Sequence, residues 1–179
     1  MSIQMTPVAF TADYEGEPGQ RTFYLQARDE ERTLTYLVEK QQVSLLADKF
    51  RELLMMVDAN DTIKNTPPIR DPALALEGPL EPEARLGTMG LAYEEDEDRV
   101  MVVMQPVTEM ATEEEQEEED LVEREDTVRL YLRRDQVRSF ILHALAATGE
   151  GRPICQLCGL PMDPAGHVCP ASNGHRTGV

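Results

Sequence analysis

The chain has few aromatic side chains, no tryptophan and only three cysteines, all of them between positions 155 and 169. Aromatic residues make up 5% of its 179 residues, while apolar residues as a whole make up 41%. That length suits one domain of ordinary size, and the apolar fraction is enough for a real core, which argues against wholesale disorder. Aliphatic side chains and nine methionines must therefore build the core.

Long apolar runs are also missing, and no stretch approaches the length that crosses a bilayer. Residues 1–6 contain neither a basic region nor an apolar run, so they do not read as a secretory signal. An odd number of cysteines argues against a disulfide framework. These absences predict a cytoplasmic protein that does not contact a membrane.

Negative charge is abundant, with a formal net charge of −17, but it is unevenly spread. Residues 113–120 carry seven acidic side chains, whereas the charges of residues 149–179 cancel. An acidic body repels phosphate backbones, which disfavours nucleic-acid binding by the main domain. A run of this kind is typical of a solvated insertion, so we expect residues 108–126 to form a disordered loop rather than a partner-binding tract.

Catalytic signatures are absent as well. The sequence contains no glycine-rich phosphate loop with lysine and serine or threonine, and no Gly-x-Ser-x-Gly elbow. With three histidines in all, a serine–histidine triad has few possible bases. These observations favour a protein that is not an enzyme, without excluding one.

The apolar pattern predicts strands and helices in two similar sets. β-forming residues predict strands over 21–28 and 32–38, and apolar residues at helical spacing predict a helix over 41–60. Three prolines between positions 67 and 72 predict a long surface loop over 61–84. The second set comprises strands over 86–93, 99–105 and 127–132 and a helix over 134–148. His143 lies off the apolar stripe of that helix, and we expect it to be exposed.

The two sets resemble each other around their helix starts. Residues 36–43 match residues 130–137, since in both a strand ends in two charged residues and a Gln-Val pair then opens a helix. We therefore predict an α+β fold in which two hairpin-plus-helix units form an antiparallel sheet with both helices on one face. This domain should span residues 1–148, followed by a metal-binding tail over 149–179.

The tail carries the residues with the clearest chemistry. Cys155 and Cys158 are separated by two residues, a spacing that places two sulfurs on one cation, and Cys169 follows after a Gly/Pro-rich return. Zinc prefers four nitrogen and sulfur ligands. The fourth ligand is either His167, which we prefer because it lies inside the return, or His175 as the reserve, which lies nearer the C-terminus. Three cysteines and one histidine form a closed structural site without a position for water.

Other uses of the cysteine pair fit less well. A redox dithiol places its cysteines at a helix start, whereas Cys155 follows Pro153 in a segment with little helix potential. An iron–sulfur cluster and plain reduced cysteines are the remaining alternatives. Metal binding would supply folding free energy on the order of 10 kcal/mol to a segment that has almost no core.

Five segments together resemble a bacterial family of unknown function, known mainly from actinobacteria and green non-sulfur bacteria. They are residues 19–28, 37–43, 86–89, 155–170 and 173–174, of which the block over 155–170 is the most specific. The resemblance covers most of the chain but implies little about function. In this family, neighbouring genes tend to encode a histidine-phosphatase-like and a lipid-kinase-like protein, which implies an association with phosphoryl transfer and no more.

Three functions remain open at this point. We expect a non-catalytic protein-interaction module in which a zinc knuckle docks a protein partner. The alternatives are an accessory protein that contacts nucleic acid through the knuckle, where Arg152 and Arg176 lie, and a zinc-dependent or phosphoryl-transfer-linked enzyme.

Overall fold

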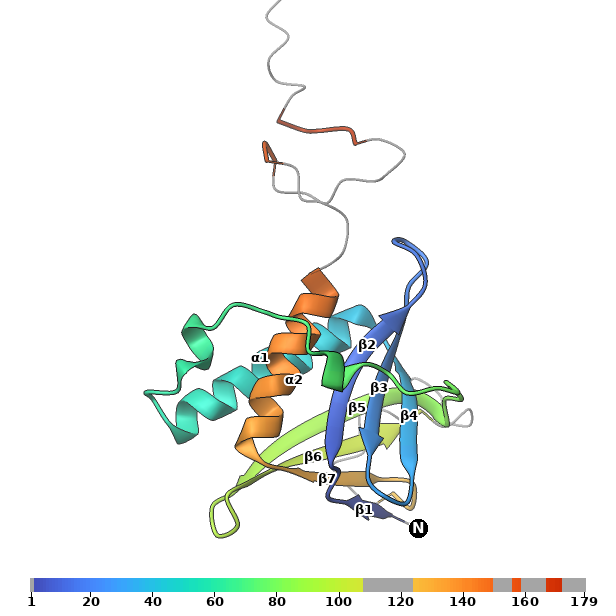
Figure 1. Cartoon of the computed structure of the whole chain (residues 1–179), viewed down its shortest axis with the longest axis vertical. Coiled ribbons are helices and arrows are strands. Elements are labelled where there is room, and N and C mark those ends of the chain that lie inside the picture. Colours follow the sequence, from blue (N-terminus) through green and yellow to red (C-terminus); the bar gives the residue numbers. More distant parts are fainter. Residues whose placement is uncertain (1, 108–123, 150–155, 159–166, 172–179) are drawn as a thin grey trace, which may run out of the picture.

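The computed structural model describes residues 2–107, 124–149, 156–158 and 167–171. Seven strands and two long helices follow one another along these residues (Figure 1). The strands are β1 (Ile3–Met5), β2 (Ala9–Glu15), β3 (Thr22–Arg28), β4 (Thr33–Val38), β5 (Ala84–Glu94), β6 (Arg99–Pro106) and β7 (Val128–Leu132). The helices are α1 (Lys40–Val57) and α2 (Arg134–Gly149), with 3₁₀ turns η1 (Thr62–Asn65) and η2 (Pro72–Leu74) between α1 and β5.

The α+β class is confirmed, but the sheet is mixed and the prediction of an antiparallel sheet is wrong. Its strand order is β1-β7-β6-β5-β4-β3-β2, and the pairs β1–β7 and β4–β5 are parallel. The remaining pairs are antiparallel. Each parallel pair joins segments far apart in the sequence, and local patterns carry no information about such pairing. β1 and β2 stand at opposite ends of the strand order yet are joined by residues 6–8, so the sheet curls round.

Each half of the chain is a three-stranded antiparallel unit followed by a helix. The first unit is β2-β3-β4-α1 and the second is β5-β6-β7-α2. The sequence-based prediction therefore missed the first two strands of the chain, β1 and β2. In β2, the alternation of Phe10, Ala12 and Tyr14 with polar residues is the signal that identifies this strand from the sequence.

Two glutamines cap the helices and tie the units to each other. The side-chain oxygen of Gln42 accepts the N–H of Glu39 at 2.8 Å, and that of Gln136 accepts the N–H of Arg133 at 2.9 Å. The side-chain amide nitrogen of Gln42 donates to the carbonyl oxygens of Leu86 and Gly87 in β5, which belongs to the second unit. The amide nitrogen of Gln136 donates to the carbonyl oxygen of Pro7, which directly precedes the first unit. The Gln-Val pairs therefore mark equivalent junctions.

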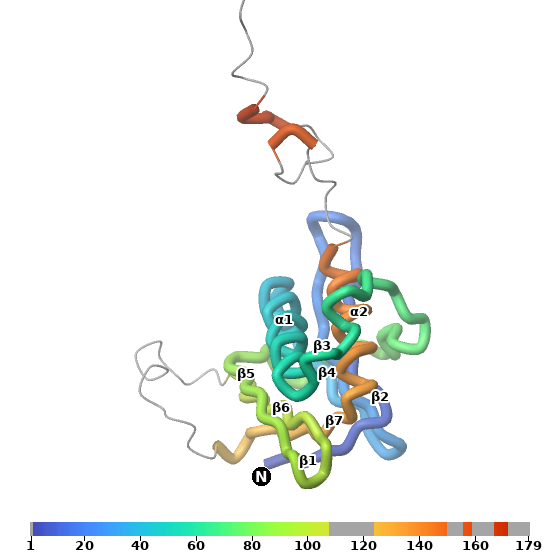
Figure 2. Tube along the Cα trace, turned by 90° about the vertical axis from the view of Figure 1, so that its left-hand side faces the viewer, coloured from blue at the N-terminus to red at the C-terminus, as the bar shows by residue number. Residues whose placement is uncertain are grey.

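An aromatic cluster forms the centre of the core between the sheet and the helices. The rings of Phe10 in β2 and Phe140 in α2 stack with centroids 4.8 Å apart, and Phe50 in α1 meets the Phe140 ring edge-on at 5.3 Å. Beyond the end of α1, the carboxylate of Asp61 accepts three hydrogen bonds from the guanidinium of Arg138 near the start of α2. The two helices thus run antiparallel, side by side on the same side of the sheet (Figures 1 and 2).

Residues 67–83, here called the crossing segment, are more than the predicted surface loop. They run past α2 and then over β2 and β3 (Figure 1). There the backbone of the crossing segment forms hydrogen bonds, as donor and as acceptor, with buried polar side chains of the two strands. Thr11 donates to the carbonyl oxygen of Leu74 at 2.6 Å, and Gln26 exchanges two hydrogen bonds with the backbone of Glu77. The crossing segment therefore seals the face of β2 and β3 that carries polar residues.

His143 is buried, with 1% of its surface exposed, so the expectation of an exposed side chain is wrong. Its Nδ1 accepts the backbone N–H of Asp71 at 3.0 Å, and its Nε2 lies 2.9 Å from a carboxylate oxygen of Asp13. Because Nδ1 accepts a hydrogen bond, the neutral ring carries its proton on Nε2 and donates it to Asp13. His143 thereby holds the crossing segment to β2.

The carboxylate of Asp13 is the charged centre of this cluster. Burial raises the pKa of Asp13, but hydrogen bonds from His143 and from the N–H of Tyr14, together with the guanidinium of Arg70, lower it. The net result is a pKa below the ordinary value. Arg70 reaches the same carboxylate at 2.8 Å, so the buried charge is paired.

We predict that Asp13→Asn destabilises the protein by about 2 kcal/mol at pH 7, because the ion pair with Arg70 is lost in a buried setting. The pKa of Asp13 is lowered on folding, so its contribution is complete above about pH 4 and is lost as the pH falls through the folded-state value. Urea unfolding at pH 7 and pH 3 measures both effects. Asp96→Asn in the exposed β5–β6 turn is the control, and a difference as large at pH 3 as at pH 7 would contradict the assignment.

A second prediction concerns the tie between the units. Gln136→Glu keeps the oxygen that caps Arg133 but replaces the donor to Pro7 by a second oxygen. Two acceptors then face each other in a buried position, so we expect a loss of roughly 2 kcal/mol in the free energy of unfolding. Chemical denaturation at neutral pH measures it, with the exposed Gln41→Glu as the matched control. Equal stability of the two variants would show that the tie is dispensable.

Candidate metal centre

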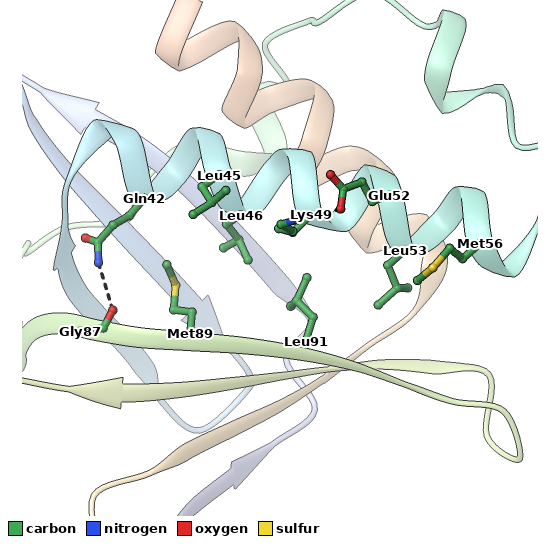
Figure 3. Close-up of a pocket in the computed structure, with 10 residues that line it drawn as sticks. All are labelled: Gln42, Leu45, Leu46, Lys49, Glu52, Leu53, Met56, Gly87, Met89 and Leu91. Carbon is green, nitrogen blue, oxygen red and sulfur yellow. Dashed lines mark hydrogen bonds and ion pairs between the residues drawn. The ribbon is translucent and has the colours of Figure 1, made fainter. Parts of the chain in front are cut away.

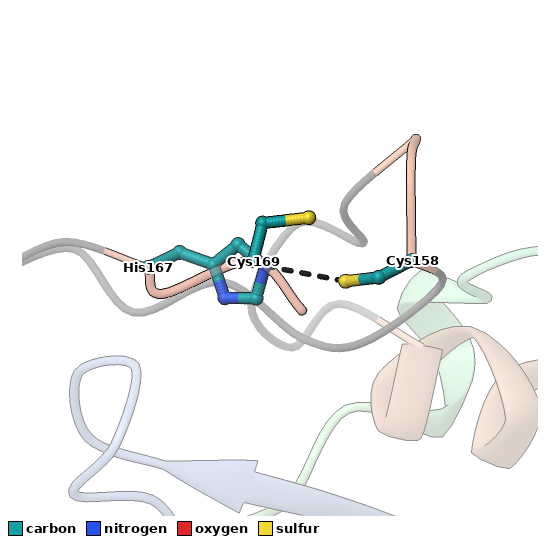
Figure 4. A group of neighbouring side chains, drawn as sticks. All are labelled: Cys158, His167 and Cys169. Carbon is teal, nitrogen blue, oxygen red and sulfur yellow. Dashed lines mark hydrogen bonds between the residues drawn. The ribbon is translucent and has the colours of Figure 1, made fainter. Parts of the chain in front are cut away.

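Three potential metal ligands converge in the described part of the tail. Cys158 ends a turn over residues 156–158, and His167 and Cys169 lie in the second described stretch, just before a turn at residues 170–171. The two cysteine sulfurs and one ring nitrogen all lie within 4.8 Å of one another (Figure 4). Residues nine to eleven positions apart therefore reach one point, as the spacing predicts.

The geometry of this group fits a small tetrahedral ion. The Sγ of Cys158 lies 3.3 Å from the Nε2 of His167. Sulfur and nitrogen ligands at the usual zinc distances of about 2.3 and 2.0 Å stand roughly 3.6 Å apart on a tetrahedron. A shift of a few tenths of an ångström would therefore seat both atoms on one ion. Cys158, His167 and Cys169 could together hold a metal ion.

The surroundings of the ligands also suit a metal. Cys169 is buried, while Cys158 and His167 are half-buried. Neither described cysteine forms a disulfide, so both sulfurs could serve as metal ligands. A thiolate binds a borderline-soft ion such as Zn²⁺ in preference to Ca²⁺ or Mg²⁺, which take oxygen ligands. The donor set thus favours a transition metal.

Two of the predicted ligand candidates lie outside the described residues. These are Cys155 and the reserve ligand His175. The structure thus brings together three of the four preferred ligands, and the choice of Cys155 to complete the set stays a prediction. Within the residues that the structure describes, no other group of three or more histidine, cysteine or acidic side chains is arranged to hold a metal ion.

The buried histidine of α2 is a separate feature. Both ring nitrogens of His143 are engaged, one by the N–H of Asp71 and one by Asp13, so neither nitrogen is positioned to bind a metal or a substrate. Its role is to hold the crossing segment. Neither the helical spacing nor the residue type indicates this role in the sequence.

Two apolar side chains in the described part of the tail are exposed, and the sequence pattern did not identify them. Leu157, next to the ligand Cys158, is 72% exposed, and Val168, between His167 and Cys169, is 82% exposed. The arrangement presents an apolar tip beside the metal ligands.

No helix within the described residues has both the length and the apolar character needed to cross a membrane. Comparisons with curated proteins and with solved structures give no match. The model of one protein family, described as a protein of unknown function (DUF3090), matches residues 5–169, which include the core, the crossing segment and the three described ligands. The chain therefore belongs to the DUF3090 family.

Proposed function

We propose that this protein is a zinc-binding interaction module, in which Cys155, Cys158, His167 and Cys169 hold a structural zinc ion. The convergence of Cys158, His167 and Cys169 within 4.8 Å carries the proposal. Cys155 adds a third thiolate through the two-residue spacing that zinc sites commonly use. The segment has little apolar material of its own, so metal binding supplies its folding free energy.

The proposed role of the zinc is structural rather than catalytic. Three thiolates and one imidazole complete a tetrahedral shell, which leaves no position where a water molecule could be activated. A catalytic zinc keeps one position open for water or substrate. The ligand set therefore favours a zinc that fixes the shape of the tail.

The tail is proposed to act by docking protein. Leu157 and Val168 are exposed beside the ligands, and apolar side chains held rigidly at a tip are the usual anchors of a small docking element. The net charge of −17 disfavours contact with phosphate backbones, so a protein partner fits better than a nucleic acid. We place this protein in the cytoplasm, where reduced cysteines persist.

The first test is the metal itself. We expect the purified full-length chain to contain about one zinc per molecule, and Cys158→Ser and Cys169→Ser to lose it, because a serine hydroxyl does not ionise near neutral pH. Elemental mass spectrometry after gel filtration measures the content. X-ray absorption should give Zn–S distances of about 2.3 Å and Zn–N distances of about 2.0 Å with no oxygen ligand.

Two variants separate the candidate histidines in that experiment. His167→Ala should lose zinc or bind it far more weakly, whereas His175→Ala should keep one zinc per chain. Loss of zinc only in His175→Ala would exchange their roles. A bound water in the absorption spectrum of the wild type would overturn the structural assignment and favour the enzyme alternative.

The second test is partner binding. The zinc-loaded chain, used as bait, should retain a protein that is released by Leu157→Asp with Val168→Asp, because the apolar anchors are lost while the ligands remain. The zinc content of the variant, measured on the same sample, is the control. A partner that binds both forms equally would place the interface elsewhere.

A further inference from the structure

An apolar hollow lies between α1 and β5, on the flank of α1 that faces away from α2 (Figure 3). Its volume is about 470 Å³. At one end, the side chain of Gln42 closes it by donating to the carbonyl oxygen of Gly87 at 3.1 Å. The walls are mostly apolar and include Leu45, Leu46, Leu53, Met56, Met89 and Leu91.

The hollow exists because β4 and β5 part. The two strands pair only at Ala84 and Arg85 among the described residues, while β5 continues to Glu94 beside β6. α1 spans the gap without filling it, and two of its apolar side chains reach solvent: Leu45 is 59% exposed and Met56 is 81% exposed. Apolar surface gathered at a hollow is typical of a binding site.

The equivalent junction in the other half of the protein is closed. There α2 meets β2, and the chain that follows α1 covers the place: Ile69 donates to the carbonyl oxygen of Leu142, and Asp71 donates to His143. The same segment then binds Thr11 in β2 through the carbonyl oxygen of Leu74. The chain that leaves α1 thus covers the junction formed by α2.

Corresponding residues occupy the closed and the open junction. His143 lies six positions after Val137 in α2, and Lys49 lies six positions after Val43 in α1, so the two residues occupy corresponding places in the two helices. His143 contacts the crossing segment, whereas Lys49 lines the open hollow. The segment that follows α2, which corresponds to the one that follows α1, is the metal-binding tail.

The tail also starts in the right place. The two helices are antiparallel, as Asp61 and Arg138 show at one end, so the C-terminal end of α2 lies beside the N-terminal end of α1 (Figures 1 and 2). That end of α1 carries Gln42 and Leu45, which line the hollow. The tail therefore begins near one end of an apolar hollow that no described residue fills.

We propose that the zinc-bound tail docks on its own chain, with Leu157 and Val168 buried against the hollow between α1 and β5. In the structure the described tail residues lie beyond the end of α2 (Figure 1), so docking moves them toward α1. The proposal rests on the proposed zinc site, which holds Leu157 and Val168 together. It makes the hollow and a protein partner alternative binding sites for these two side chains, so a partner must displace the docked tail.

The chain length permits this docking. Leu157 lies eight positions after Gly149, and an extended chain of that length spans about 26 Å. α1 is 18 residues long, which corresponds to about 27 Å. Leu157 can therefore reach most of the hollow from the end of α2. A short tether also gives an effective concentration in the millimolar range, which favours the chain's own tail over a second copy.

Hydrogen–deuterium exchange of the full-length, zinc-loaded protein tests the docking. We expect the amides of β5 over 88–94 to exchange roughly tenfold more slowly in the wild type than in a Leu157→Asp, Val168→Asp variant, because the docked tail shields this strand. Leu45→Asp with Met56→Asp should in turn speed exchange in residues 156–171. These two α1 residues are exposed, so the variant should fold.

Controls separate docking from other effects. Val8→Asp and Ile69→Asp change exposed apolar residues outside the hollow and should leave β5 exchange unchanged. Zinc content is measured on every sample. A chain that binds zinc but shows equal β5 exchange in all variants overturns the docking alone, and a chain without zinc overturns the proposed function.

Two further outcomes identify other occupants. Protection of β5 that rises with protein concentration, with a dimer in light scattering, would assign the hollow to a second copy and overturn docking within one chain. Protection that appears only when a protein partner is added would assign it to that partner, with the same consequence. Protection independent of concentration in a monomer supports the proposal.

Discussion

Two parallel strand pairs, β1 with β7 and β4 with β5, hold the two halves of the molecule together, and the remaining architecture depends on them. Each pair joins the segment that leads into one unit to the last strand of the other, so neither unit completes its sheet alone. Gln42 and Gln136 add a side-chain tie at each of these junctions. The pairs also fix where each helix lies against the opposite unit, and so create two corresponding junctions between helix and strand.

Among the described residues, one of the two junctions is covered by another segment of the chain and the other is not. At the first, the crossing segment packs on α2 and β2. The buried Asp13 and His143, together with the partly exposed Arg70, make that contact specific because each polar atom needs its partner. At the second, α1 and β5 leave an apolar hollow. An architecture with near-equivalent halves thus has one sealed side and one open side, and the open side lies near the point where the tail with Cys158, His167 and Cys169 begins.

The tail and the body differ in the interactions that can stabilise them. The body gains its stability from aliphatic burial around a small aromatic cluster, whereas the tail has few apolar residues and its ligands converge on one point. The spacing of Cys158, His167 and Cys169 predicted this convergence, since ligand geometry depends on short loops that the sequence displays directly. Neither the exposure of Leu157 and Val168 nor the hollow between α1 and β5 had a counterpart in the sequence reading, because exposure depends on what packs nearby.

The sequence by itself determined the local features: the strand–helix order after residue 20, the positions of both helices, and the convergence of Cys158, His167 and Cys169. Alternation, helical spacing and ligand spacing each involve residues a few positions apart, so neighbouring residues decide them. The tertiary structure alone decided the parallel pairings, the burial of His143, and the role of the crossing segment. These features join residues between 48 and 130 positions apart, and no local pattern records which distant partner satisfies a strand edge or a polar side chain.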